Sequence, residues 1–174
     1  MPSDYQLVKD GAACPDEWVY LDDDAALGDA PAIISLDRLR NESAALKTRN
    51  APLGVVLRAD NQGKQQMGED VHELAPYLNM VQLVAIEFPV YRNGRGYSNA
   101  RILREQLGFT GELRATGEVL HDQWQFMARC GFNAFELAPN ISLEEFTAAL
   151  GELSDAYQPA ADSQRGALWR RHGL

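Results

Sequence analysis

Short apolar runs recur along the chain at intervals that suit alternating strands and helices. Six runs have the length of a strand: residues 18–21, 32–35, 53–57, 83–88, 112–116 and 133–137. The centres of the last five are 22, 29, 29 and 22 residues apart. Such spacing is typical of consecutive strand–helix units, whose strands pair in parallel. The pattern therefore predicts an α/β fold with a mainly parallel sheet.

Helix signals fill the intervals between these runs. Asp37 is placed to cap a helix that ends before Pro52, and a shorter helix follows Asp70. Ser98 is placed to accept a hydrogen bond from a free amide at the start of a helix that Gly108 ends. We expect these helices to bury one apolar stripe each against the sheet.

Two further helices are expected towards the C-terminus. Thr116 is placed to cap the first of them, which ends at Gly131. Ser142 and Glu145 have the spacing of a capping box, and the helix that they begin is expected to end near Tyr157.

The length of the chain indicates one α/β domain over residues 1–157, followed by an irregular tail over residues 158–174. The sheet is expected to be either an open parallel sheet or an incomplete TIM-like barrel, because a complete eightfold barrel takes about 250 residues. An incomplete barrel exposes the edges of its sheet, and a homodimer can cover them.

The charge and composition narrow the range of partners. A net charge of −9 disfavours binding to nucleic acid or to an anionic membrane surface. The apolar runs are far shorter than the about 20 residues that cross a bilayer, and the N-terminus does not have the pattern of a secretory signal. The two cysteines, Cys14 and Cys130, lack the spacing of a zinc site. We therefore expect a cytoplasmic protein without a metal site.

The loop over residues 91–98, Tyr-Arg-Asn-Gly-Arg-Gly-Tyr-Ser, is the main candidate for binding. It follows the carboxyl end of a predicted parallel strand, where ligands bind in α/β folds. Its glycines free backbone amides, and arginine forks match the oxygens of phosphate or sulfate. The predicted anion-binding residues are Arg92, Gly94, Arg95, Gly96, Ser98 and Arg101.

A structural interpretation of the same loop stays open. Asn93 and Gly94 can form a turn, Gly96 can relieve crowding, and the arginines can pair with surface acids such as Glu105. The loop also lacks the third glycine of a dinucleotide-binding fingerprint and the lysine of a P-loop. The pattern therefore disfavours dinucleotide binding.

Glu87 is the candidate catalytic residue. It follows an apolar strand and precedes Pro89, so partial burial can suit its carboxyl group to acid–base chemistry. The alternative is an ion pair with Arg114 on the adjacent strand, and the same two interpretations apply to Glu136.

Four phrases in fixed order carry a resemblance to a known family: GRGYS, ARILRE, GELRATG and RCGF. With them the chain resembles the bacterial Domain of Unknown Function 934 family over residues 31–162, most strongly over residues 86–137. The resemblance implies a role in sulfite reduction, as an oxidoreductase or an accessory protein, because genes of this family tend to lie beside those for the sulfite reductase haemoprotein. It assigns no catalytic residue.

Two functions follow as hypotheses. The chain shows no fingerprint for flavin, nicotinamide, an iron–sulfur cluster or haem, so no cofactor is expected and an accessory role in assimilatory sulfate and sulfite reduction fits better than electron transfer. Its partner would be the sulfite reductase haemoprotein or another sulfate-assimilation enzyme, docked by the arginine-rich loop or the basic tail. The alternative is a small βα enzyme that binds a phosphorylated or sulfated metabolite at residues 91–98.

Overall fold

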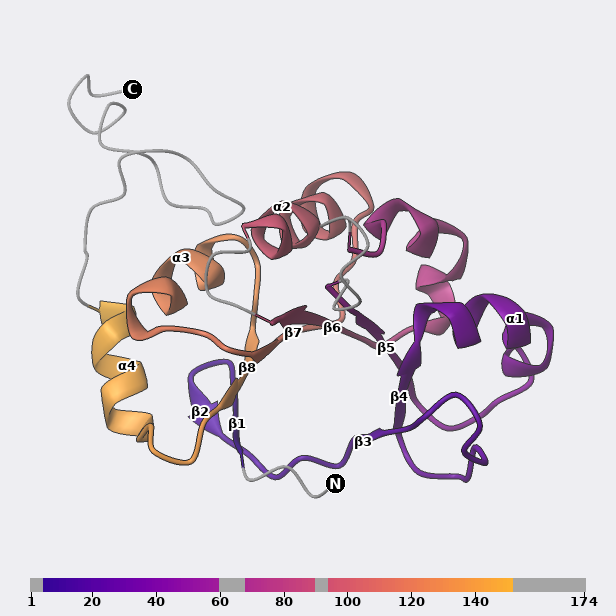
Figure 1. Cartoon of the computed structure of the whole chain (residues 1–174), viewed down its shortest axis with the longest axis horizontal. Helices are drawn as coiled ribbons and strands as arrows, with labels where there is room; N and C mark the ends of the chain where they lie inside the picture. The colour runs from indigo at the N-terminus through magenta and orange to yellow at the C-terminus, as the bar shows by residue number, and fades with distance from the viewer. Residues whose placement is uncertain (1–4, 60–67, 90–93, 152–174) are drawn as a thin grey trace.

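The computed structural model describes residues 5–59, 68–89 and 94–151, which form a half-barrel (Figure 1). Its strands make one curled sheet in the order β2-β1-β8-β7-β6-β5-β4-β3. The strand bounds are β1 Gln6–Lys9, β2 Ala12–Ala13, β3 Val19–Tyr20, β4 Ala32–Ser35, β5 Leu53–Leu57, β6 Leu83–Phe88, β7 Glu112–Gly117 and β8 Ala134–Leu137. Strands β3 to β8 pair in parallel, as predicted.

The first two strands form a hairpin that the apolar pattern did not predict. Strand β1 pairs antiparallel with both β2 and β8. Asp10 and Gly11 connect β1 to β2, and both have positive φ values, of 50° and 81°. An Asp-Gly pair in this conformation is typical of a two-residue hairpin turn, so this dipeptide was the signal for the hairpin.

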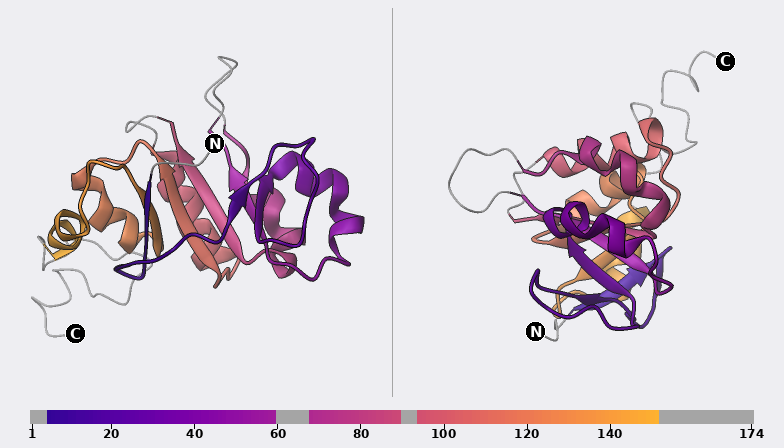
Figure 2. Two further views of the ribbon diagram at one scale, coloured as in Figure 1. Left: turned by 90° about the horizontal axis from the view of Figure 1, so that it is seen from below. Right: turned by 90° about the vertical axis from the view of Figure 1, so that its right-hand side faces the viewer.

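The helices lie outside the curled sheet (Figure 1, Figure 2). The α-helices are α1 Leu36–Leu46, α2 Arg95–Arg101, α3 Trp124–Arg129 and α4 Leu143–Gly151. A 3-10 helix, η1, spans Val71–Met80, a π-helical turn, η2, continues α2 over Ile102–Gln106, and a short 3-10 turn, η3, spans His121–Gln123. The simple strand–helix alternation is therefore confirmed only in part, since several connections are short or irregular.

Three predicted helix starts were wrong. Helix α1 is capped by Ser35, whose hydroxyl accepts a hydrogen bond from the amide of Arg38 at 3.0 Å, and Asp37 lies inside the helix. Helix α2 begins at Arg95, so Ser98 is an exposed residue within it. Thr116 belongs to strand β7. Cap propensity alone therefore did not locate the first residue of these helices.

Two other predicted starts are confirmed. The carboxylate of Asp70 accepts a hydrogen bond from the amide of His72 at 3.0 Å at the start of η1. Ser142 and Glu145 form the reciprocal capping box, with bonds of 2.9 and 3.1 Å. The predicted end of this helix near Tyr157 and the tail lie outside the described residues.

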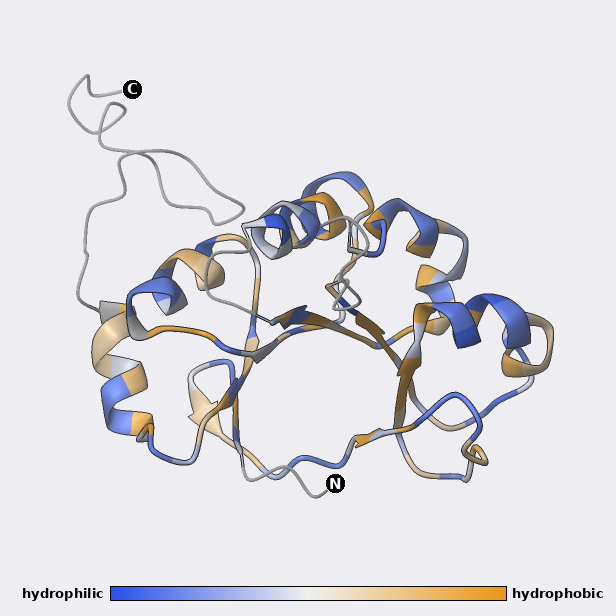
Figure 3. Cartoon of the chain, viewed as in Figure 1, coloured by the Kyte–Doolittle hydropathy of each residue, from blue (hydrophilic) through white to orange (hydrophobic). Residues whose placement is uncertain are grey.

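The two faces of the sheet differ in chemistry. The outer face packs against the helices in the main core, where Val55, Val84 and Leu113 are fully buried. On the inner face, Ile33, Val56, Leu83 and Ala85 form a second cluster, against which Trp18 packs. Strands β4 and β5 are largely apolar (Figure 3). Polar residues on the inner face are concentrated on β7 and β8, at the other side of the half-barrel.

Residues 14–18, which we call the strap, link β2 at one end of the sheet to β3 at the other. The strap crosses the open side of the half-barrel (Figure 1). It therefore brings side chains from the N-terminus opposite the inner face of β7 and β8. Within the described residues, no helix has the length and apolar character of a membrane span.

Candidate functional site

Four inward-facing polar side chains lie in one row at the carboxyl ends of neighbouring strands. Glu87 pairs in register with Thr116. The pairing of Leu57 with Ile86 places Arg58 beside Glu87, and the pairing of Ala115 with Phe135 places Thr116 beside Glu136. We call Arg58, Glu87, Thr116 and Glu136 the rim row. Neighbouring strands lie about 4.8 Å apart, so each member lies next to the following one.

The inner face below the rim row contains Arg114, which is completely buried. Its guanidinium contacts three carboxylates: Asp16 of the strap at 2.7 Å, Glu112 at 2.8 Å and Glu136 at 3.1 Å. Lys9 also pairs with Glu112, at 2.9 Å. These five groups, Arg114, Lys9, Asp16, Glu112 and Glu136, form what we call the interior ion cluster.

Hydrogen bonds in the interior ion cluster shift several pKa values. Burial alone disfavours the charged form of Arg114, but the hydrogen bonds that Arg114 donates to Asp16 and the charge of Glu112 outweigh it, so the pKa of Arg114 is raised. Burial also acts to raise the pKa of Asp16, yet hydrogen bonds from Arg114 and Tyr5 lower it overall. The hydrogen bond to Glu112 raises the pKa of Lys9. For Arg114, Asp16 and Lys9 the hydrogen bonds within the cluster therefore favour the charged form.

Glu136 has its carboxylate oxygens occupied on both sides. One accepts hydrogen bonds from the Tyr20 hydroxyl at 2.7 Å and from Arg114, and the other accepts from the Thr116 hydroxyl at 2.5 Å. Loss of solvent around the phenol, together with the charge of Glu136, raises the pKa of Tyr20. The structural interpretation of Glu136, an ion pair with Arg114, is thereby confirmed.

Glu87 does not share this arrangement. Arg114 is bonded to the three carboxylates of the interior ion cluster, so the alternative pairing of Glu87 with Arg114 was wrong. Glu87 is half-buried. No described residue forms a hydrogen bond or an ion pair with its carboxylate. The guanidinium of Arg58 likewise has no bonded partner among the described residues, although its backbone amide donates to Glu69 at 2.5 Å.

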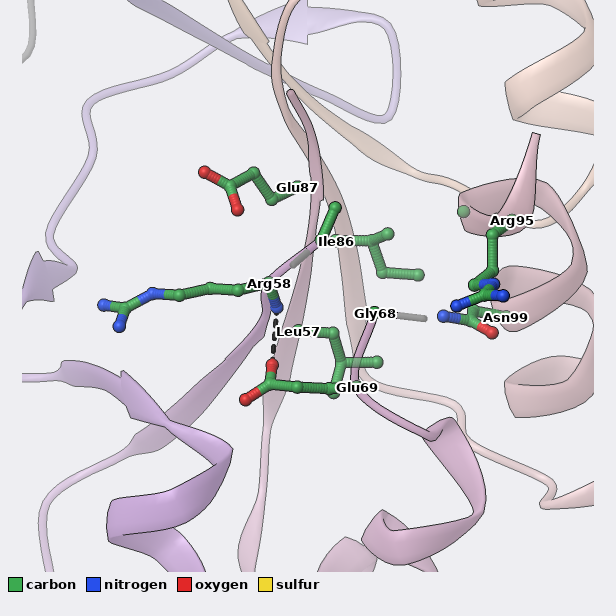
Figure 4. A pocket seen from close by; sticks show the side chains of 10 residues that line it. Leu57, Arg58, Gly68, Glu69, Ile86, Glu87, Arg95 and Asn99 are labelled. Atoms are coloured by element: carbon green, nitrogen blue, oxygen red, sulfur yellow. Dashed lines mark hydrogen bonds between the residues drawn. The ribbon is translucent and has the colours of Figure 1, made fainter. Parts of the chain in front are cut away.

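A pocket lies between the carboxyl ends of β5 and β6 and the start of α2. Its lining residues are Leu57, Arg58, Ala59, Gly68, Glu69, Ile86, Glu87, Arg95, Gly96 and Asn99. Figure 4 shows that Arg58 and Glu87 extend to one side of the strands, whereas Arg95 and Asn99 lie on the other side. The hydrogen bond from Arg58 offsets only part of the burial that raises the pKa of Glu69.

The structure separates the predicted anion-binding residues. Arg95 and Gly96 line the pocket together with Glu87, but from the helix side. Gly94 directly precedes α2 and does not line the pocket, and Arg92 lies outside the described residues. Arg101 is exposed and pairs with Glu105 at 3.0 Å, which matches the structural interpretation of the arginines.

Gly96 has a packing role in the structure. A Cβ atom at this position would lie 2.4 Å from the ring of Phe88, so only glycine allows α2 to lie this close to β6. Crowding, which was the alternative for this glycine, is therefore confirmed. Arg104, on the same helix, donates to the backbone carbonyls of Phe109 and Gly111 at 2.7 and 2.9 Å and so stabilises the following turn.

Arg58 was not among the predicted site residues. Its position in the sequence could have identified it, because Arg58 directly follows the apolar residue Leu57 at the end of a strand, just as Glu87 follows Ile86. Asp16 and Tyr20 were missed altogether, because Asp16 lies in the strap and Tyr20 on strand β3, and both meet β7 and β8 only once the sheet curls. The described part of the chain contains no group of three or more side chains arranged to hold a metal ion.

Comparison with protein families gives one match. The model of the family described as "Bacterial protein of unknown function (DUF934)" matches residues 64–168, which include the pocket residues from Gly68 onward. A comparison with curated protein sequences found no match.

Proposed function

Because this chain belongs to the DUF934 family of bacterial proteins, whose description names no activity, we propose a function from the site itself. The protein binds a small phosphorylated or sulfated metabolite between Arg58 and Glu87. The observation that carries this proposal is the pair of oppositely charged, unbonded side chains at the carboxyl ends of β5 and β6. In parallel α/β sheets, ligands bind at this edge.

Arg58 supplies the contact to the anion. Its guanidinium is exposed at the rim and is not committed to another residue, unlike Arg114 and Arg101. A guanidinium binds two oxygens of phosphate or sulfate at once, and it stays charged at all physiological pH values. In a chain with a net charge of −9, an arginine without a carboxylate partner is a selective place for an anion.

Glu87 supplies the second functional group. Its carboxylate is half-buried on the inner face, next to Arg58 and Thr116. We propose that it acts as a general acid or base towards the bound metabolite, which would make the protein a small βα enzyme. The six parallel strands that end at this rim fit our interpretation of the sheet as a shortened TIM-like barrel.

Substitution of Arg58 tests the proposal directly. We expect Arg58→Gln to weaken binding of inorganic sulfate, phosphate and their organic esters by roughly tenfold to a hundredfold, because a charge-assisted hydrogen bond is lost. Isothermal titration calorimetry on the full chain measures this effect. Arg101→Gln is the matched control, since Arg101 is also an exposed arginine but pairs with Glu105. Equal affinities in Arg58→Gln and the native protein would rule out this site.

The accessory role in sulfite reduction stays a prediction that rests on the sequence resemblance. The proposed anion site is consistent with that context, because sulfite and sulfate esters carry the group that Arg58 would bind. Affinity capture with the sulfite reductase haemoprotein tests the partner. A deletion strain that reduces sulfite normally, together with no capture, would contradict the accessory role.

A further inference from the structure

We infer that the metabolite bound at the rim carries a hydrogen-bond donor, a hydroxyl or an ammonium group, close to its anionic group. This inference rests on the proposed function and narrows its ligand class. Arg58 would hold the anionic group, and Glu87 would accept the hydrogen bond.

The first step is the placement of the two side chains. Leu57 and Ile86 are paired in register, so Arg58 and Glu87 follow them as neighbours on adjacent parallel strands. Both side chains extend to the same side of the strands (Figure 4). Adjacent strands lie about 4.8 Å apart, so the two side chains start from neighbouring backbone positions.

The second step is that neighbouring residues do not complete the hydrogen bonding of Glu87. The adjacent Thr116 has one hydroxyl proton, and it donates that proton to Glu136. On the other side, Arg58 makes no ion pair with Glu87 among the interactions of the described residues. An ionised carboxylate only accepts hydrogen bonds, so the oxygens of Glu87 are open to water or to a donor group of a ligand.

The third step concerns selectivity. A ligand with only an anionic group would place like charges close together at Glu87 and would bring no donor to replace the water that it displaces there. A ligand with a donor beside its anionic group removes both problems. Glu136 is not an alternative acceptor, because its oxygens already accept three hydrogen bonds.

Matched pairs of small ligands test this inference. Taurine and ethanesulfonate share a sulfonate, and phosphoethanolamine and ethyl phosphate share a phosphate, but only the first member of each pair has an ammonium group. With the native protein, we expect the ammonium-bearing member to bind roughly tenfold or more tightly than its partner in calorimetric titrations. The same comparison with isethionate in place of taurine tests a hydroxyl donor.

Variants at position 87 identify the acceptor. We expect Glu87→Gln and Glu87→Ala to abolish the preference within each pair while the plain anions bind as well as before or better. Glu105→Gln is the control, because Glu105 is an exposed carboxylate that pairs with Arg101. Thermal unfolding of each variant checks that the fold is retained.

The outcomes separate the two proposals. Equal binding of both members of a pair to the native protein, with loss of both in Arg58→Gln, overturns this inference and leaves the anion site in place. A preference that persists in both variants at position 87 also overturns it. Absence of binding by every probe at millimolar concentration overturns the proposed function together with the inference.

Discussion

Arg114 shows how a single buried charge is tolerated inside this half-barrel. Removal of a guanidinium from water is costly, and it is offset only where carboxylates and good geometry surround the charge. Here three carboxylates lie within 3.1 Å of the guanidinium, and two of them belong to other segments than β7. The guanidinium of Arg114 is therefore fully used by these carboxylates, which is why the proposed anion site uses Arg58 instead.

Asp16 makes the stability of the fold depend on acidity. Burial opposes ionisation of its carboxyl group, but hydrogen bonds from Arg114 and Tyr5 lower its pKa below the ordinary value of 3.8. A carboxyl group whose pKa is lower in the folded state than in the unfolded state stabilises the fold at pH values above its unfolded-state pKa. This contribution disappears as the pH falls through its folded-state pKa. Ionised Asp16 thus stabilises the fold at neutral pH.

We expect Asp16→Asn to lower the free energy of unfolding most at pH values above about 4, with a difference from the native protein that shrinks in more acidic solution. Urea denaturation across the acidic and neutral range measures it. Asp24→Asn is the control, because Asp24 is exposed and lies outside the interior ion cluster. A difference that grows as the pH falls would contradict this account of Asp16.

Substitution of Gly96 tests why the predicted loop contains glycine at this position, either to avoid crowding or to let a ligand approach the backbone. We expect Gly96→Ala to destabilise the fold by about 1–3 kcal/mol, because the added methyl group would overlap the ring of Phe88. Gly94→Ala is the matched control, since a Cβ atom there meets nothing within 4 Å. Chemical denaturation measures both. Equal stability of the two variants would mean that α2 shifts away from β6 without cost.

At the scale of elements, the helix caps show where local sequence signals were sufficient. The capping box of Ser142 and Glu145 formed as predicted because both partners lie within one turn of chain. The predicted start of α2 was wrong because the helix begins at Arg95 and already packs against Phe88 of β6 at Gly96, before Ser98 is reached. A cap motif therefore identifies a helix better than it identifies its first residue.

Two serines allow a direct comparison. Ser35 is buried, accepts a hydrogen bond from Arg38 and donates one to Asp23 at 2.6 Å, so we expect Ser35→Ala to cost about 1–2 kcal/mol of stability. Ser98 is exposed within α2, and Ser98→Ala should change stability by less than about 0.5 kcal/mol. Thermal denaturation of both variants measures the difference. A larger loss in Ser98→Ala would restore Ser98 as the cap.

At the scale of the whole molecule, the strap decides how the curled sheet is completed. Asp16 contacts Arg114, and Tyr20 on β3 contacts Glu136, so two polar contacts join this part of the N-terminal segment to β7 and β8. The edge strands β2 and β3 are nevertheless exposed, and Val19 on β3 is 49% exposed. Such an edge is open to pairing with another chain.

We expect the protein to form a homodimer through the edge strand β3, because an incomplete barrel leaves such an edge uncovered. Light scattering on the purified chain measures the molar mass. Val19→Lys should shift the mass towards the monomer, because a lysine on an edge strand disfavours strand pairing. Glu17→Lys on the exposed strap is the control for the added charge. A monomeric native protein would contradict the prediction.

The sequence by itself determined the six parallel strands, the α/β class and the position of Arg58 and Glu87 at the ends of strands, because strand period and turn residues act over a few neighbouring positions. Only the tertiary structure decided which charges are bonded to each other. Asp16 and Arg114 are 98 residues apart, and Tyr20 and Glu136 are 116 apart. Curling of the sheet brought these groups together, satisfied Glu136 and left Arg58 and Glu87 facing the same side without a bonded partner among the described residues.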